Sequence, residues 1–297
     1  MRRIPILACL IANVCFAARP VIFDTDMGND IDDALALAVL HALSDRGECD
    51  LIGVTLTNAH PAAVPYIRMA NRFYGRGDLP VGAAIKELKD GANDHYMRAA
   101  MRTAPAASAS PAELAPTLLR RLLSNAREKV VIVQTGFSTN LAALLDSPGG
   151  AALAKEKVAL VVAMAGNFAG GEPEYNVRID VASAKAVFER WPTPIVFSGY
   201  EIGRDLLYPA ASIEHDFAYA RPHPIAESYR ANSLFISPPT EWWSRRQMIR
   251  ERMARLSGPS TPEPSRRNCN RSKPNRRSHS RTRRRTRENY ASPRGSA

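Results

Sequence analysis

The sequence predicts an α/β fold, a doubly wound, mostly parallel sheet flanked by helices. Continuous apolar runs of strand length recur at 130–136, 158–166 and 194–199, and each ends in glycine. Runs of this kind are typical of parallel strands that are buried on both faces. Stretches rich in Ala and Leu, long enough for helices, alternate with these runs at 111–127 and 140–146. This alternation of strands and helices favours a doubly wound sheet.

The first predicted strand and helix bracket the most informative stretch, VIFDTDMGNDIDDALALAVL at 21–40. Val21–Phe23 is a short apolar run typical of a buried strand, and the Ala/Leu-rich run that begins at Ala34 predicts a helix. Five carboxylates lie between them, namely Asp24, Asp26, Asp30, Asp32 and Asp33. In open α/β sheets, ligands bind beyond the carboxyl ends of the strands. Crowded carboxylates repel one another unless a cation compensates, and oxygen-only ligands favour Ca²⁺ or Mg²⁺.

Simpler interpretations explain less of this acidic stretch. Capping of a helix N-terminus needs only one or two Asp. An EF-hand loop needs Gly at its sixth position, where the count gives Asn29 or Ile31. A haloacid dehalogenase-like phosphatase also begins with a strand and a D-x-D pair, but Gly28 stands where its usual Thr would be. The phosphatase stays open as an alternative function.

Four segments resemble the motifs of one known family, in the same order. DTDMGNDIDDALAL is similar to the signature D-x-D-x-G-x-D-D-A of the inosine-uridine nucleoside hydrolase family, with two extra residues between Gly28 and Asp32. VTLTNAH, VIVQTGFSTNLAALL and VVAMAGNFAGGEPEYNVRIDVASAKAVF resemble its later motifs, so the resemblance covers roughly residues 21–203. It implies a nucleoside hydrolase-like fold and Ca²⁺-dependent hydrolysis of the N-ribosidic bond of nucleosides to ribose and free base, in purine and pyrimidine salvage.

The resemblance also implies roles for the polar residues at the strand ends. Asp26, Asp33 and the carbonyl of Thr135 correspond to metal ligands. Asp26 is the first choice for the catalytic base that takes a proton from a metal-bound water, and Asp32, on the ribose hydroxyls, is the second. The role of Asp30, within the two-residue insertion, stays open. The ribose contacts correspond to Asn58, Met164, Asn167, Glu174 and Asn176.

The positive charge of the chain, +11 overall, is concentrated at its C-terminal end. Residues 257–297 hold twelve Lys or Arg and two Glu, so residues 1–256 carry only about +1. This end has almost no aliphatic residues, so we expect a disordered basic C-terminal tail. Such a tail could contact nucleic acid nonspecifically through its phosphates. A noncatalytic ribose- or nucleic-acid-binding protein is therefore a second class of function that the sequence leaves open.

The C-terminal part of the hydrolase-like domain departs from the family pattern. By resemblance, a last calcium-binding Asp is expected near residue 249, but the sequence there, SRRQMIRERMARLSG, contains no Asp. After about Arg230 the chain becomes rich in Arg, Ser and Pro, which is typical of a GC-rich gene read out of phase. We therefore predict a frameshift or an altered C-terminus that would impair activity, and a natural basic extension is the alternative.

Residues 1–17 resemble a secretory signal peptide. Arg2 and Arg3 precede a mostly apolar run at 4–16, and Cys15 and Ala17 are small residues at a plausible cleavage site. Because this run is too short to span a bilayer comfortably, no membrane span is expected. We expect a secreted or periplasmic protein, with a cytoplasmic enzyme as the alternative, divided into residues 1–17, 18–256 and 257–297. A nucleoside is the expected partner, while a homo-oligomer and the base preference stay open.

Overall fold

The computed structural model describes residues 18–28, 30–88, 94–103, 110–206, 208–217 and 222–233. These residues belong to one compact unit within residues 1–260. The predicted signal peptide, the region around residue 249 and the predicted basic tail lie outside the described residues. Within the described ranges, no helix combines the length and the apolar character that a membrane crossing requires.

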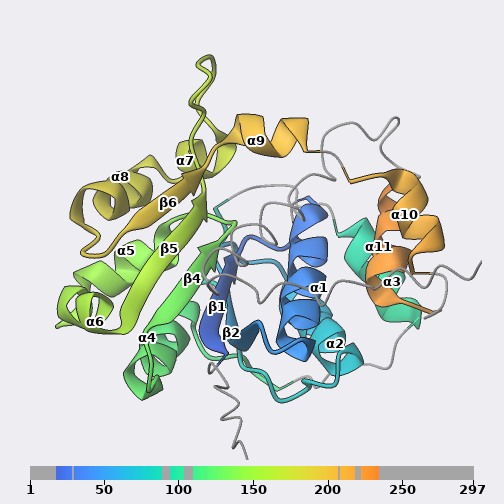
Figure 1. The fold of residues 1–297 in the computed structure, drawn as a ribbon, viewed down its shortest axis with the longest axis horizontal. Coiled ribbons are helices and arrows are strands. Elements are labelled where there is room, and N and C mark those ends of the chain that lie inside the picture. The colour runs from blue at the N-terminus through green and yellow to red at the C-terminus, as the bar shows by residue number, and fades with distance from the viewer. Residues whose placement is uncertain are drawn as a thin grey trace, which may run out of the picture. The chain divides into compact units, whose positions relative to one another are not determined.

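The sheet has six strands in the order β3-β2-β1-β4-β5-β6 (Figure 1). They are β1 (Arg19–Thr25), β2 (Cys49–Leu56), β3 (Val81–Gly82), β4 (Val130–Gln134), β5 (Val158–Met164) and β6 (Ile195–Ser198). Neighbouring strands among these six all pair in parallel. Strands β2 and β3 lie to one side of β1, and β4 to β6 lie to the other. The strand order therefore reverses between β1 and β4, which is where open α/β sheets bind ligands.

Helices cover both faces of the sheet (Figure 1), which confirms the predicted fold class. One face carries α1 (Asp32–Asp45), α2 (Ala63–Phe73), α3 (His95–Thr103) and α11 (Pro224–Ser233). The other carries α4 (Ala115–Asn125), α5 (Thr139–Asp146), α6 (Gly150–Lys157) and α8 (Val181–Arg190). The shorter described helices are α7 (Tyr175–Ile179), α9 (Tyr200–Asp205) and α10 (Ala210–His215). Along β1, Val21 and Phe23 belong to the first core and Ile22 to the second, because successive side chains of a strand point to opposite faces.

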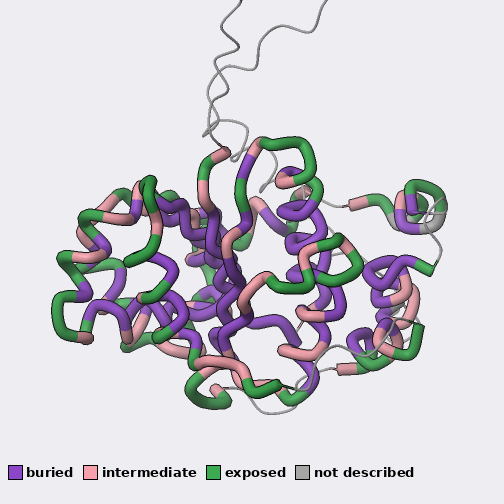
Figure 2. Tube along the Cα trace, turned by 90° about the horizontal axis from the view of Figure 1, so that it is seen from below, coloured by how far each residue is buried: buried purple, intermediate pink, exposed green. Residues whose placement is uncertain are grey.

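The central strands are buried on both faces. All of β4 is buried, as is β1 from Val21 onward. Figure 2 shows this burial as purple through the strands, with the exposed green segments on outer turns. Burial on both faces explains why these strands are continuously apolar in sequence instead of alternating between apolar and polar residues.

Two helices begin at residues other than the predicted ones. Helix α1 begins at Asp32 instead of Ala34, so Asp32 and Asp33 form its first turn, where the partial positive charge of the helix N-terminus favours carboxylates. Helix α4 begins at Ala115, inside the predicted range 111–127, with proline in its first turn, where a missing N–H is tolerated. Two of the five clustered carboxylates are thus held by helix geometry instead of by a loop.

Candidate active site

The candidate site lies at the carboxyl ends of β1 and β4, at the reversal in strand order. Asp26 directly follows β1, and Asp32 and Asp33 open α1. These three side chains are exposed by at most 3%, and Thr135, directly after β4, is exposed by 4%. Burying several carboxylates together is costly unless hydrogen bonds or a cation compensate for the lost water.

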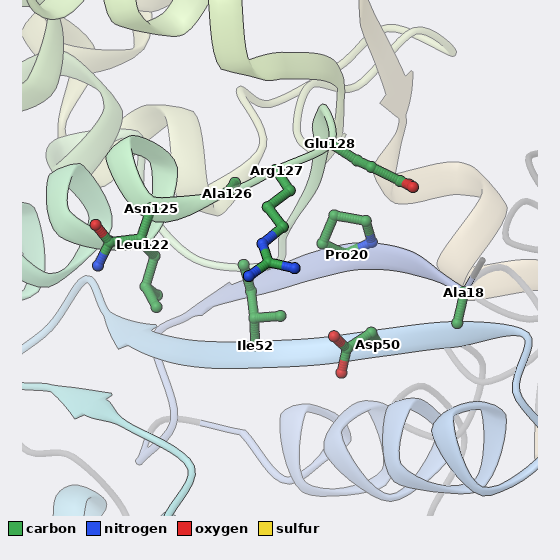
Figure 3. A pocket seen from close by; sticks show the side chains of 9 residues that line it. All are labelled: Ala18, Pro20, Asp50, Ile52, Leu122, Asn125, Ala126, Arg127 and Glu128. Carbon is green, nitrogen blue, oxygen red and sulfur yellow. The ribbon is translucent and has the colours of Figure 1, made fainter.

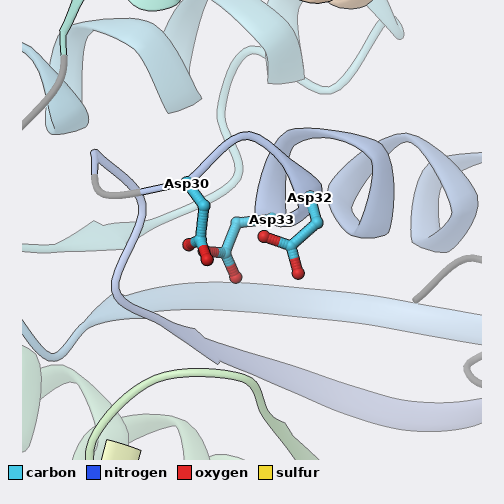
Figure 4. Close-up of side chains that lie close together, drawn as sticks. All are labelled: Asp30, Asp32 and Asp33. Carbon is cyan, nitrogen blue, oxygen red and sulfur yellow. The ribbon is translucent and has the colours of Figure 1, made fainter. Parts of the chain in front are cut away.

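Three carboxylates in this region form a cluster that could bind a metal ion. One oxygen from each of Asp30, Asp32 and Asp33 lies within 4.8 Å of the others. Figure 4 shows the three side chains directed to the same side of the loop and of the first turn of α1. An anionic, all-oxygen donor set fits a hard cation such as Ca²⁺ or Mg²⁺. The cluster includes the predicted ligand Asp33 and also Asp30, whose role the sequence leaves open, whereas Asp26 is not one of its members.

Thr135 connects the acidic cluster to the ends of β4 and β5. Its hydroxyl donates a hydrogen bond to Oδ1 of Asp33 at 2.5 Å. Its carbonyl accepts a hydrogen bond from Nδ2 of Asn176 at 2.8 Å. The same amide nitrogen donates to the carbonyl of Met164 at 3.0 Å and contacts its sulfur at 3.3 Å. The structure therefore brings together four of the residues that the sequence predicts for the site.

Glu174 holds the segment that presents Asn176. Its carboxylate caps α7, accepting hydrogen bonds from the backbone N–H groups of Asn176 at 2.8 Å and of Val177 at 3.1 Å. It also accepts from the N–H of Gly166 at 3.2 Å, which joins α7 to the loop after β5. Negative charge at a helix N-terminus is stabilising. Glu174 thus fixes the loop and the helix that lie beside the cluster.

Two further predicted residues hold neighbouring loops through their side-chain amides. Asn58, which follows β2, is buried, and its Oδ1 accepts a hydrogen bond from the N–H of Leu88 at 2.8 Å. Asn167, which follows β5, donates from Nδ2 to the carbonyl of Glu172 at 3.0 Å. Both residues therefore lie at the carboxyl edge of the sheet, as predicted, and organise the loops at that edge.

Asp24 supports the site from within the sheet. Its carboxylate accepts hydrogen bonds from Thr55 at 2.6 Å, Asn140 at 2.8 Å and Gln134 at 3.2 Å. Burial raises the pKa of Asp24 to about 6, and these three hydrogen bonds act in the opposite direction. Its partners lie in β2, α5 and β4, so Asp24 joins three elements beneath the loop that carries Asp26.

Gly136 allows the loop after β4 to pass close to the loop after β1. A Cβ atom at this position would lie 2.6 Å from the backbone nitrogen of Asp26 and 2.8 Å from the backbone carbon of Thr25. It would also collide with the Thr57 hydroxyl, which accepts a hydrogen bond from the N–H of Phe137 at 3.0 Å. Glycine is therefore required for the close approach of Thr135 to the acidic loop.

Sequence reasoning missed two tyrosines near the acidic cluster, Tyr96 in α3 and Tyr229 in α11. Both are fully buried. Burial raises the pKa of each hydroxyl well above its ordinary value, and the negative charges of the nearby aspartates raise it further. Among these aspartates, Asp32 raises the pKa of Tyr229 the most. Neither tyrosine lies in a motif, so their nearness to the site follows from the packing of α3 and α11 alone.

A pocket of about 400 Å³ lies at the opposite edge of the sheet, where β1 and β2 begin (Figure 3). It is lined by Ala18, Pro20, Asp50, Ile52, Leu122, Asn125, Ala126, Arg127 and Glu128. None of the predicted site residues lines this pocket. Because open α/β sheets bind their ligands at the carboxyl edge, we do not assign the pocket to the active site.

Comparison with known proteins agrees with this geometry. The model of the family "Inosine-uridine preferring nucleoside hydrolase" matches residues 21–251, beyond the last motif recognised in the sequence. The pyrimidine-specific ribonucleoside hydrolase RihA of Salmonella enteritidis is 33% identical over 218 residues, which cover 69% of this chain and 68% of that protein. The RihA protein of Citrobacter koseri is 31% identical over 199 residues, covering 62% and 61% respectively.

Solved structures show the same fold at lower identity. A purine-preferring ribonucleoside hydrolase from Gardnerella vaginalis has a TM-score of 0.60 at 18% identity, covering 80% of this chain and 81% of that one. A plant nucleoside hydrolase, PpNRh1, has a TM-score of 0.59 at 22% identity, covering 80% and 79%. The chain therefore belongs to the inosine-uridine preferring nucleoside hydrolase family, and it is a hydrolase that acts on the N-glycosyl bonds of nucleosides.

Proposed function

We propose that this protein is a Ca²⁺-dependent ribonucleoside hydrolase that releases ribose and free base. The observation that carries the proposal is the acidic cluster of Asp30 and the buried Asp32 and Asp33 at the reversal in strand order, joined to Thr135 by a hydrogen bond to Asp33. Oxygen-only ligands on a loop and a helix start suit Ca²⁺, which accepts six to eight oxygens in varied geometry.

The chemistry requires stabilisation of the positive charge that develops at the anomeric carbon. Cleavage of the C–N bond passes through a state with oxocarbenium character. In this proposal the buried carboxylates of Asp26, Asp32 and Asp33 supply negative charge near the carbon at which this positive charge develops. Asp26 acts as the general base for the attacking water, with Asp32 as the alternative, and such help contributes about 10²–10⁴ in rate. Bound Ca²⁺ would supply a Lewis acid that orients the ribose 2′- and 3′-hydroxyls and makes a coordinated water more acidic.

The ribose pocket is proposed to consist of Asn58, Met164, Asn167, Glu174 and Asn176. Of these, Glu174 and Asn176 are held in place by several hydrogen bonds each, which limits their movement before substrate binds. Polar groups that are fixed in advance discriminate strongly between substrates with and without a matching hydroxyl. We therefore expect preference for ribose over 2′-deoxyribose, because a missing hydroxyl leaves its protein partner unsatisfied.

For the base, we propose only which nucleosides to assay first. The relatives that are 31–33% identical are named pyrimidine-specific, so uridine is the first substrate, with inosine beside it. The family assignment replaces the phosphatase alternative. Three expectations concern residues outside the described ranges, namely secretion, nucleic-acid contact through the tail and an altered C-terminus. Self-association is also untested. All four stay predictions.

Ribose release from uridine and inosine tests the proposal. The full chain would be assayed as purified, after treatment with a chelator, and after Ca²⁺ or Mg²⁺ is added back. We expect ribose release that chelation abolishes and Ca²⁺ restores. Ribose release that continues after chelation would show that the reaction does not need the metal. Ca²⁺ binding without ribose release from either substrate would favour the noncatalytic ribose-binding alternative.

A further inference from the structure

The acidic loop is held by a residue from a distant helix. The hydroxyl of Tyr96, in α3, accepts a hydrogen bond from the backbone N–H of Gly28 at 3.0 Å and donates one to the backbone carbonyl of Asp30 at 3.1 Å. Gly28 precedes the stretch in which the chain has two residues more than the family signature, and Asp30 lies within that stretch. One side chain therefore closes the part of the loop in which this sequence departs from its family.

The loop has a local conformation that needs such support. Gly28 has a φ of 117°, in the region that only glycine adopts readily. A Cβ atom there would also lie 3.3 Å from side-chain atoms of His60 and Met97. A glycine restricts the unfolded chain little, so ordering this turn costs conformational entropy that specific contacts must offset.

Tyr96 is itself rigidly placed. Its ring packs edge-on against that of Tyr66 in α2, with ring centroids 5.7 Å apart and planes at 89°. The hydroxyl of Tyr66 is hydrogen-bonded to that of Ser228 in α11 at 2.8 Å, and Ser228 donates to the carbonyl of Pro224 at 2.9 Å. Both tyrosines are fully buried. Contacts between α2, α3 and α11 therefore hold the ring of Tyr96, and with it the hydroxyl, in one position.

We propose that Tyr96 is a positioning residue for the metal site. By fixing the backbone at Gly28 and Asp30, its hydroxyl holds the Asp30 carboxylate beside Asp32 and Asp33, where it serves as a further oxygen ligand. Asp32 and Asp33 are held by helix α1, whereas Asp30 lies before the helix and depends on the loop. The inference rests on the proposed function, because it concerns the same metal.

The test compares two buried tyrosines. Tyr96→Phe removes the hydroxyl that binds the loop, and Tyr66→Phe removes an equally buried hydroxyl that binds Ser228 instead. Both substitutions keep the rings and their packing. Ca²⁺ binding to the full chain would be measured by titration calorimetry, and melting of the metal-free proteins would measure the purely structural loss. We expect Tyr96→Phe to weaken Ca²⁺ binding at least about tenfold, as for other residues that orient metal ligands. Tyr66→Phe should weaken it far less, because it removes only an indirect support and keeps the ring that packs on Tyr96.

A double variant tests whether Tyr96 acts through Asp30. Asp30→Asn should weaken Ca²⁺ binding on its own. In that background Tyr96→Phe should cause little additional loss, because the group that it positions is already removed. Additive losses, or equal Ca²⁺ affinities for Tyr96→Phe and Tyr66→Phe, would overturn the inference while leaving the proposed function intact. A native chain that binds no Ca²⁺ would overturn both.

Discussion

Asp32 and Asp33 are adjacent in the first turn of α1, and their surroundings differ. Asp33 accepts the short hydrogen bond from the Thr135 hydroxyl, which ties it to β4. The negative charge of Asp32 raises the pKa of the buried Tyr229 hydroxyl, so Asp32 lies near α11. Their carboxylates lie in one cluster. The proposed division of roles, with Asp33 on the metal and Asp32 on the sugar, therefore rests on these different neighbours.

This difference predicts separate effects of two conservative substitutions. Asp33→Asn should weaken Ca²⁺ binding and ribose release together. Asp32→Asn should lower ribose release by about 10²-fold or more while keeping most of the Ca²⁺ affinity, because the role proposed for Asp32 is contact with the ribose hydroxyls. Calorimetry and the ribose assay would measure the two quantities, with Asp50→Asn, an exposed residue of β2, as the control. Equal losses of Ca²⁺ in the Asp32 and Asp33 variants would refute this division of roles.

Gly136 gives a second prediction at the residue scale. Gly136→Ala should displace the Asp26 backbone, because the new methyl group meets main-chain atoms that cannot rotate away. We expect a loss of about 1–3 kcal/mol in the free energy of unfolding, as for other overpacked sites, together with loss of ribose release. Urea denaturation measures the first effect. Gly77→Ala is the matched control, since its nearest atoms lie at 3.8 Å, and it should leave both quantities unchanged.

Sequence motifs place several candidate site residues at the ends of strands, but they give no sign of the residues that surround them. Thr135 and Met164 lie at the ends of β4 and β5, and the parallel pairing of these strands brings them together. Asn176 lies in α7, so its hydrogen bonds to both residues depend on the loop after β5. Tyr96 and Tyr229 lie in helices without any motif, and their nearness to Asp30 and Asp32 depends on how α3 and α11 pack. No spacing along the chain contains that information.

At the scale of elements, α1, α2 and the segment before α11 meet around two buried histidines. His41 of α1 is hydrogen-bonded through Nε2 to Oδ1 of Asn71 at 2.9 Å, and its ring stacks on that of Tyr74 at 4.6 Å. The Tyr74 hydroxyl lies 3.3 Å from Nε2 of His223. Burial lowers the pKa of each histidine to about 4. Both imidazoles are therefore neutral in the folded protein at neutral pH.

The charges around the two histidines mostly favour this neutral form. Arg76 lowers the pKa of His41, and Asp45 opposes that effect. Arg230 lowers the pKa of His223. Since the folded pKa values lie below the ordinary 6.5, the histidines contribute stability that is present at neutral pH. That contribution is lost as the pH falls from about 6.5 toward 4, where the unfolded chain binds more protons than the folded one.

We therefore predict that acid loosens the packing of α11 on α1 and α2. The free energy of unfolding in urea should fall between about pH 7 and pH 4.5, measured with chelator present so that metal release does not contribute. His223→Gln should flatten this dependence relative to the native chain. His215→Gln, at the exposed end of α10, is the control and should retain the full slope. Equal slopes for the two variants would exclude His223 as a source of the pH dependence.

At the scale of the whole molecule, the hydrolase motifs and the basic charge occupy different parts of the chain. The family match ends at residue 251, and every described residue lies before residue 234. The sequence predicts the fold class, because apolar runs and helical stretches alternate, but the strand order with β1 at the reversal depends on which strands pair. The altered C-terminus stays a prediction that resequencing codons 225–260 would test.

This separation predicts the effect of truncation. A chain that ends at Leu256 should keep the Ca²⁺ affinity and the ribose release of the full chain, because every residue assigned to the site precedes it. It should lose most binding to polyanions, because twelve Lys or Arg are removed. Retention on heparin at increasing salt measures this binding, which should weaken steeply for the full chain. Loss of activity in a folded truncated chain would show that the tail supplies a site residue.

The contact between Tyr66 and Ser228 spans 162 residues of sequence, and it supports a loop encoded near the start of the chain. During synthesis the acidic residues leave the ribosome early, but α11, against which α3 packs most extensively, leaves late. Contacts of such long range form slowly, because the intervening chain must first be ordered. A growing chain therefore carries Asp30 without the contacts that position it, and we expect full metal affinity only after synthesis has passed Ser228.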